Sequence, residues 1–299
     1  MTAAPAHNVF GVLASVVMLS LLPPALGAQR KAPAPPASVR VYLFDCGKLE
    51  GGDPSRFSLK REEMKTTDMS VACYLVAHPR GTLMWDVGAV PDRDVTSPGT
   101  ATRYHIVLPN GNERFVTTTQ TLKAQLAGVG YDPVDINYLA LSHYHYDHTA
   151  NANLFAGATW LVRQVERDVM FPQKPNDLTR PDTYSALRNS KTTIIKTDDY
   201  DVFGDGSVVM KLTPGHTPGH SVLFVKLAKT GPVVISGDLY HYPEERSLHR
   251  VPTFDVDPKQ TAASRTALDT FMKAANAQLW IQHDLANTAK MKKAPAYYD

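Results

Sequence analysis

Three histidines and one aspartate lie close together in residues 141–148 (LSHYHYDH), directly after an apolar run that predicts a short buried strand. In an extended segment His143 and His145 project to the same side, so both can reach one metal ion. A helix beginning near Asp147 would turn Asp147 and His148 toward a second ion. Imidazole and carboxylate are good Zn²⁺ ligands and are costly to bury unpaired. This density favours a metal site over the alternative, a solvated histidine-rich loop.

Three further candidate ligands each follow an apolar run that predicts a strand. His216 lies in residues 213–220 (TPGHTPGH), where prolines and glycines fix a tight loop. Asp238 follows the run at 233–235, and His283 follows the run at 279–281. Taken singly, each would be expected to have a structural role. Ligands gathered from several strand ends on one edge of a sheet instead form a preorganised site.

The elements that must position these groups form a mixed α/β pattern. Predicted strands and helices alternate along the chain, with strands at 39–44, 70–78, 82–86, 136–141, 159–163, 191–196, 208–212, 221–227, 232–236 and 278–282 and helices at 118–127, 149–155, 164–171 and 258–275. Residues 47–69 and 93–114 lack clean periodicity and are predicted as long surface loops. Long loops in compact domains are often functional, so we expect these two to wall the substrate pocket.

The N-terminus differs from the rest of the 299-residue chain. Residues 9–22 are largely apolar but too short to span a bilayer comfortably, and small residues follow, which predicts a signal peptide over 1–28. An uncleaved membrane anchor is the alternative. Residues 29–38 predict a Pro/Ala-rich linker before a single domain at 39–299. We therefore expect an exported protein, periplasmic or secreted, with no stable membrane association after cleavage.

Charge and cysteine content narrow the class further. A net charge of only +2 gives no sign of nucleic-acid binding, which favours a small-molecule substrate. The chain has two cysteines, Cys46 and Cys73, and an oxidising compartment would permit a disulfide between them. Because pairing geometry is not visible in a sequence, we favour the alternative of two buried, unpaired thiols.

The pattern His143-x-His145-x-Asp147-His148, followed by His216, Asp238 and His283, resembles the metallo-β-lactamase superfamily. Within it the chain most resembles the N-acyl-homoserine lactonases, through residues 72–75 (ACYL), 86–88 (DVG), 129–133 (VGYDP) and 213–220. The resemblance extends from about residue 39 to the C-terminus. It implies an αββα sandwich with two metal ions between the sheet edges.

By position, the resemblance implies that one ion is held by His143, His145 and His216 and the other by Asp147, His148 and His283, with Asp238 bridging both. His220 matches no ligand position and is expected to have a structural or supporting role. Two Zn²⁺ ions suit these donors, although Mn, Co or Fe would also be compatible. Two close cations would lower the pKa of a shared water to about 7, so that hydroxide can attack a lactone carbonyl. Asp147 would pass a proton to the leaving group.

One position departs from the lactonase pattern. The lactonases present a tyrosine three residues beyond the bridging aspartate, where this chain has His241. Tyr240 and Tyr242 flank it, and either is a candidate for the catalytic phenol. The alternatives to a lactonase are another exported dizinc hydrolase, including a β-lactamase, and a metal-binding protein without catalysis. The bridging Asp238 counts against a β-lactamase, and the full ligand set counts against a protein without catalysis.

The predicted signal peptide can be tested directly. Cleavage just after Gly27 or Ala28 predicts a mature chain that begins at Ala28 or Gln29. N-terminal sequencing of protein recovered from the native host measures this. An intact Met1, or mature protein confined to the cytoplasm, would contradict the prediction.

Overall fold

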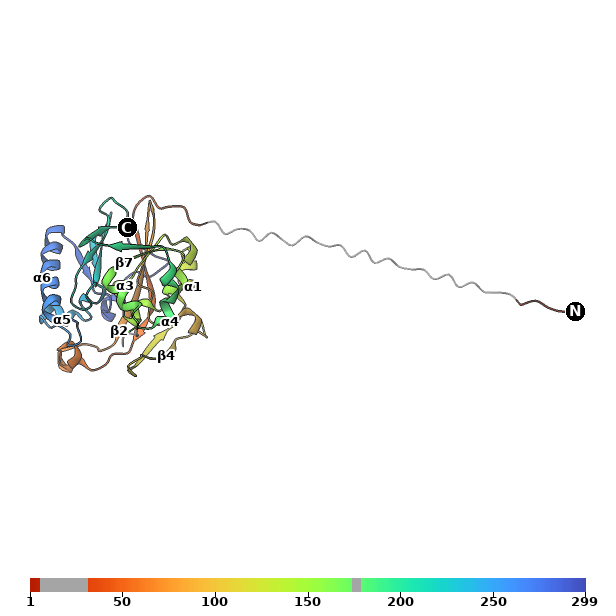
Figure 1. Cartoon of the computed structure of the whole chain (residues 1–299), viewed down its shortest axis with the longest axis horizontal. Coiled ribbons are helices and arrows are strands. Elements are labelled where there is room, and N and C mark those ends of the chain that lie inside the picture. Colours follow the sequence, from red (N-terminus) through yellow and green to blue (C-terminus); the bar gives the residue numbers. More distant parts are fainter. Residues whose placement is uncertain (6–31, 174–178) are drawn as a thin grey trace. The chain divides into compact units, whose positions relative to one another are not determined.

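The computed structural model describes residues 1–5, 32–173 and 179–299, in two units, 1–31 and 32–299 (Figure 1). Apart from its first five residues, the predicted signal peptide lies outside the described residues, as do the first three residues of the predicted linker. Within the described ranges no helix is long and apolar enough to cross a membrane. The strands and helices described here belong to the second unit.

Two sheets form the centre of this unit. In the described part of the chain the first sheet has eight strands, in the order β4-β5-β1-β2-β3-β6-β7-β8, and the second has five, in the order β13-β12-β11-β10-β9. The first sheet comprises β1 (Arg40–Leu49), β2 (Met69–His78), β3 (Gly81–Trp85), β4 (Thr102–Val107), β5 (Glu113–Thr118), β6 (Tyr138–Ala140), β7 (Thr159–Arg163) and β8 (Thr192–Ile195). The second comprises β9 (Asp199–Asp201), β10 (Val208–Leu212), β11 (Ser221–Leu227), β12 (Gly231–Ile235) and β13 (Gln278–Trp280).

The sheets pack face to face through alternating apolar side chains. Leu43, Val76 and Trp85 of the first sheet contact Val225 and Ile235 of the second, in one buried cluster. Strands bury alternate residues on opposite faces, so the same strands also supply a second apolar surface. Ten consecutive buried residues in β2 show that both faces of that strand are covered.

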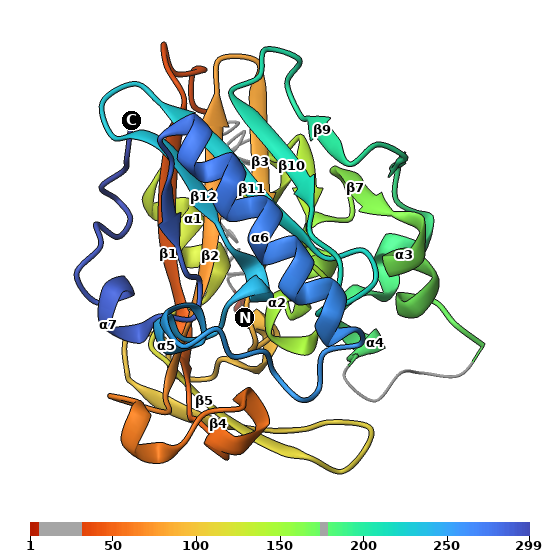
Figure 2. The same cartoon turned by 90° about the vertical axis from the view of Figure 1, so that its left-hand side faces the viewer.

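Helices cover the outer faces. The principal helices here are α1 (Leu122–Gly128), α3 (Gln164–Met170) and α4 (Pro181–Tyr184) on the first sheet and α6 (Pro258–Ala275) on the second. Figure 2 shows α6 lying along β11 and β12, where Leu268 and Met272 pack against Phe224 and Val234. The shorter helices are α2 (Tyr146–Thr149), α5 (Pro243–Ser247) and α7 (Leu285–Thr288). The result is the αββα sandwich expected from the sequence.

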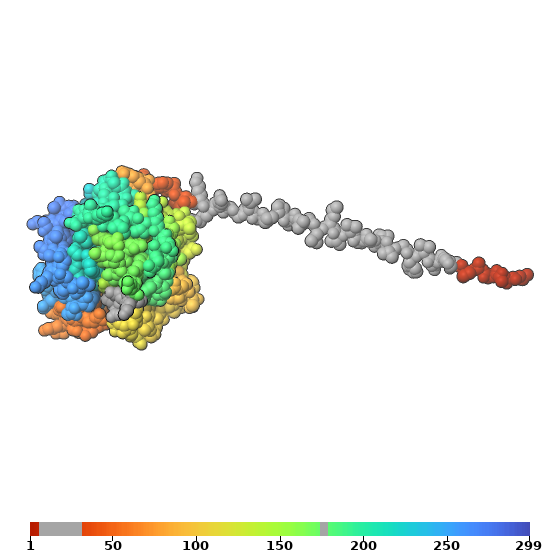
Figure 3. Space-filling model, viewed as in Figure 1, coloured from red at the N-terminus to blue at the C-terminus, as the bar shows by residue number. Residues whose placement is uncertain are grey.

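The predicted loop at 93–114 is largely a β-hairpin. β4 and β5 pair in antiparallel register, and β5 joins the sheet beside β1 through Lys48 and Leu49. The hairpin was not predicted because its strands mix charged and aromatic residues without a regular alternation of apolar and polar positions. It lies beside the segment around residue 50, at the lower end of the unit in Figures 2 and 3, and Arg103 binds Glu50 through two nitrogens.

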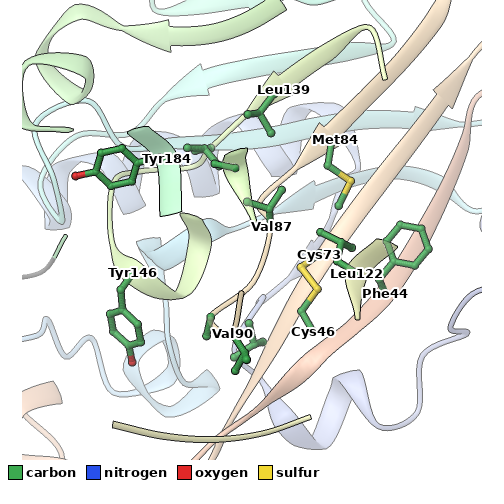
Figure 4. Close-up of a cluster of buried hydrophobic side chains, with 14 of the residues drawn as sticks. Phe44, Cys46, Cys73, Met84, Val87, Val90, Leu122, Leu139, Tyr146 and Tyr184 are labelled. Atoms are coloured by element: carbon green, nitrogen blue, oxygen red, sulfur yellow. A yellow bond between two sulfur atoms is a disulfide. The ribbon is translucent and has the colours of Figure 1, made fainter. Parts of the chain in front are cut away.

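Cys46 and Cys73 form a disulfide (Figure 4), so the favoured prediction of two unpaired thiols was wrong. β1 and β2 are neighbours, and their antiparallel register brings the two Cα atoms to 6.0 Å. The bond lies under Gly88, where an added Cβ would be 3.2 Å from the Cβ of Cys46. The carbonyl of Gly88 in turn accepts a hydrogen bond from Ala150 N, immediately after α2. The disulfide therefore supports the backbone beneath the histidine cluster.

Removing the disulfide should destabilise the domain. Closing a loop with a sequence separation of 27 residues is worth about 3.5 kcal/mol in unfolding free energy. We expect the Cys46→Ala/Cys73→Ala variant to lose about that amount in urea denaturation. Reductant should lower the stability of the wild type and leave that of the variant unchanged. Two titratable thiols in unreduced, unfolded wild-type protein would show that the bond is absent.

Candidate metal centre

The structure brings together all seven side chains predicted as metal ligands, and all are buried. They form two groups whose ligand atoms lie within 4.8 Å of one another: His143, His145, His216 and Asp238 in one, and Asp147, His148 and His283 in the other. They come from the ends of β6, β10, β12 and β13. The shared strand-end placement seen in the sequence therefore corresponds to one edge of the two sheets.

Asp238 lies between the two groups with one oxygen toward each. Its Oδ1 is 3.0 Å from His148 Nε2 and 3.0 Å from His283 Nε2. Its Oδ2 is 3.6 Å from His143 Nε2 and 3.5 Å from His216 Nε2. A carboxylate divided in this way has the geometry of a bridge between two ions.

The buried polar atoms of the site fit a pair of metal ions. His143 Nε2, His148 Nε2, His283 Nε2 and Asp238 Oδ1 are buried and, although some of them lie 3.0 Å apart, none has a partner in hydrogen-bond geometry. Leaving such groups unpaired costs about 1–3 kcal/mol each, so their convergence requires a ligand. Burial and neighbouring imidazoles hold the pKa of His143 and His145 well below the ordinary value, which keeps both as neutral donors. Nitrogen and carboxylate donors in this number suit two Zn²⁺ ions.

Local backbone geometry aims the ligands. His145 is extended (φ −66°, ψ 155°) and α2 begins at the next residue, which turns Asp147 and His148 toward the second group as the sequence predicted. Gly215 precedes His216 with φ +135°, and an added Cβ would lie 2.2 Å from Thr261 N. Only glycine allows the His216 loop to lie so close to the start of α6.

Each of four ligand histidines is oriented through its other ring nitrogen. His148 Nδ1 is 2.8 Å from Asp86 Oδ2, and His216 Nδ1 is 2.8 Å from Asp255 Oδ1. His283 Nδ1 donates to the Ser70 carbonyl at 2.7 Å, and His143 Nδ1 is 3.0 Å from Ser142 Oγ. Such partners fix the tautomer and orientation of a ligating imidazole. Asp86 and Asp255 were not predicted as site residues, because neither lies within the ligand motifs.

Two other buried polar groups hold the ligand loops. Glu166 accepts hydrogen bonds from Tyr144 N (3.1 Å) and Gly219 N (2.7 Å), which joins the histidine cluster to the His216 loop. Burial raises the pKa of Glu166 to about 7, although these donors act in the opposite direction. His220 Nε2 accepts from Asp238 N at 3.0 Å, and burial lowers the pKa of His220 to about 3. The neutral His220 thus supports the bridging residue.

The prediction for the two flanking tyrosines needs correction. The Tyr242 hydroxyl donates to the Thr67 carbonyl at 2.6 Å, and the Tyr240 ring packs in the cluster under α6 with Arg265 4.2 Å from its centroid. The backbone is extended at Tyr240 and at Tyr242, so the two side chains leave the site on either side of His241. His241 itself faces the ligands, with Nε2 3.1 Å from Asp238 Oδ2.

A cavity of about 210 Å³ opens onto the ligands His145, Asp147 and Asp238. Its walls come from residues 49–57 and from the β4–β5 hairpin, as the position of the two predicted loops indicated. Phe57, Phe115 and Phe254 give it apolar sides. Tyr146 is the one tyrosine among the described residues that lines it.

Fold and site together define a metal-dependent hydrolase, and the chain belongs to the metallo-beta-lactamase superfamily, whose family model matches residues 66–277. Among curated relatives, the N-acyl homoserine lactonase AttM of Azorhizobium caulinodans is 28% identical over 87% of this chain and 99% of its own length. AiiA, the N-acyl homoserine lactonase of Bacillus thuringiensis subsp. kurstaki, is 25% identical over 78% of this chain and 88% of its own length.

Solved structures show the same fold. An N-acyl homoserine lactone hydrolase with the product N-hexanoyl-L-homoserine at its catalytic metal center superposes with a TM-score of 0.70, at 24% identity, over 87% of this chain and 99% of that one. AidC, a dizinc quorum-quenching lactonase, superposes with a TM-score of 0.59, at 17% identity, over 87% of this chain and 94% of that one.

The supporting carboxylates allow the two metal sites to be weakened separately. Asp255→Ala should lower metal affinity in the group with His216, and Asp86→Ala should lower it in the group with His148, by about 10–100-fold each. Metal content per chain and zinc-chelator competition measure this, with each variant serving as the control for the other. We expect wild type to hold two equivalents and each variant to lose one ion first. Retention of both ions at wild-type affinity in both variants would contradict these roles.

Proposed function

We propose that this protein is an exported lactonase that opens the ring of N-acyl-homoserine lactones at a two-zinc centre. The observation that carries the proposal is the bridging position of Asp238 between two complete ligand groups beside a partly apolar cavity. Relatives named N-acyl homoserine lactonases, aligned over most of the chain, support the substrate class.

The chemistry requires an activated water and a polarised carbonyl. Two bound zinc ions would supply both, by lowering the pKa of a water to about 7 and by acting as Lewis acids. The protein's own contribution is to fix the ligands and to leave one side open. The cavity meets the centre at His145, Asp147 and Asp238, so a lactone ring is expected to enter there.

The residues at the cavity floor have distinct tasks. Asp147 lies at the junction of centre and cavity, where its carboxylate can carry a proton to the departing alkoxide. His241 takes the place where the lactonase pattern has a tyrosine. Its Nδ1 lies 3.2 Å from Glu245 Oε1, and Arg265 binds the other oxygen of Glu245 at 2.6 Å. The buried Glu245 and Arg265 therefore hold the imidazole toward the substrate.

Export forms the second part of the proposal. The apolar N-terminal segment motivates it, and the disulfide between Cys46 and Cys73 supports it, because such bonds persist in oxidising compartments. A lactonase outside the cytoplasm would meet its substrates as they diffuse between cells.

The substrate class can be tested by direct competition between ring types. Opening a lactone releases an alkoxide, which leaves more readily than an amine, so we expect kcat/KM for the best homoserine lactone to exceed that for any β-lactam by at least about 100-fold. Proton release in weak buffer follows lactone opening, and absorbance follows opening of a penicillin, a cephalosporin and a carbapenem. Asp238→Ala serves as the inactive control. Equal or faster lactam turnover would instead support a β-lactamase.

A further inference from the structure

Two arginines line the cavity without an acidic partner. Arg56, from the short helical turn Pro54–Phe57, and Arg114, from β5, both contribute to its wall. Within the described part of the chain, no carboxylate lies within ion-pair distance of either guanidinium. Burial, and then the charge of Arg114, lowers the pKa of Arg56, so the two cations act on each other.

The carboxylates near this pair are already engaged. Glu50 is bound by both nitrogens of the Arg103 fork, at 2.6 and 2.9 Å. Asp53 accepts from the backbone and the hydroxyl of Ser55, at 2.9 and 2.6 Å. Glu113 is 3.4 Å from His105. Tyr146 and Asp53 raise the pKa of Arg56, but each by less than Arg114 lowers it. An anion that enters the cavity would therefore further relieve the repulsion between the two guanidinium groups.

Both arginines are close to the reaction centre. The Arg56 guanidinium lies 5.0 Å from the centroid of Phe254, and that ring is 5.8 Å from the ring of the ligand His216. Arg114 shares the cavity lining with Tyr146, which stands between His145 and Asp147 in the chain. One aromatic ring therefore separates Arg56 from a metal ligand, and Arg114 lines the same cavity as the ligands His145 and Asp147.

We propose that Arg56 and Arg114 form an anion-binding subsite. It would hold a carboxylate carried on the acyl arm of the substrate, a few bonds from the ring that is opened. Guanidinium groups match carboxylates through paired, charge-assisted hydrogen bonds. Phe57, Phe115 and Phe254 would cover the short apolar part of the arm. This inference rests on the proposed lactonase function and narrows its substrate.

A matched pair of lactones tests the subsite. N-glutaryl- and N-pentanoyl-homoserine lactone have arms of the same length, and only the first ends in a carboxylate. We expect the zinc-loaded wild type to favour the glutaryl substrate in kcat/KM by about tenfold or more, and salt to reduce this preference. Arg56→Gln/Arg114→Gln should abolish the preference and leave turnover of the pentanoyl substrate within about threefold. The control Arg80→Gln removes a charge from the distant turn between β2 and β3. It should change neither the preference for the glutaryl substrate nor the turnover of the pentanoyl substrate.

A binding measurement separates failure of the subsite from failure of the lactonase proposal. Calorimetry of the zinc-loaded wild type should show that the ring-opened product N-glutaryl-homoserine binds about tenfold more tightly than N-pentanoyl-homoserine. The double variant should bind the two products with equal affinity. If no lactone is opened but this difference is found, the subsite stands and the lactonase proposal fails. Equal affinities in the wild type, or a preference for the glutaryl lactone that survives in the double variant, would overturn the subsite.

Discussion

The structure depends on the cost of holding five imidazoles and two carboxylates in one buried space. Four of their converging atoms, the Nε2 atoms of His143, His148 and His283 and Oδ1 of Asp238, lack hydrogen-bond partners, and the bridging Asp238 is 3% exposed. Only cations can satisfy such a set, and they bind well only if the ligands are already fixed. A second set of buried polar groups therefore orients the ligands and the loops that carry them. This set includes Asp86, Asp255, Glu166 and His220.

These orienting groups explain why two sheets are needed. Asp86 follows β3 of the first sheet, yet it accepts hydrogen bonds from Ser142 N and from Gln282 Nε2, after β13 of the second. Glu166 links the cluster after β6 with the loop after β10 in the same way. The apolar contacts between the sheets set the distance across which these bonds form. Packing and metal geometry are therefore coupled, and loosening the sheet interface would be expected to misplace ligands far from the change.

The parts of this arrangement that could be predicted were those encoded locally. Ligand type and spacing within 143–148, and an apolar run before each remaining ligand, identified all seven groups and the edge where they meet. The disulfide, the β4–β5 hairpin and the directions of the Tyr240 and Tyr242 side chains could not be predicted in this way. Each depends on which distant segment is the neighbour: Cys73 beside Cys46, β5 beside β1, and Thr67 as the acceptor for Tyr242. Pairing of this kind leaves little periodic signal in one sequence.

The metal ligands and the cavity walls have different tasks: the ligands serve catalysis and the walls serve substrate specificity. The ligands stand at strand ends with their orientation over-determined, so substitutions there would disturb metal binding before anything else. The cavity walls come instead from residues 49–57 and from a hairpin at the edge of the sheet, whose strand β5 pairs with β1 at Lys48 and Leu49. These segments can change in charge and shape without moving a ligand. Because Arg56 and Arg114 belong to the walls and not to the centre, selection for a particular acyl arm can act on them while the reaction itself is preserved.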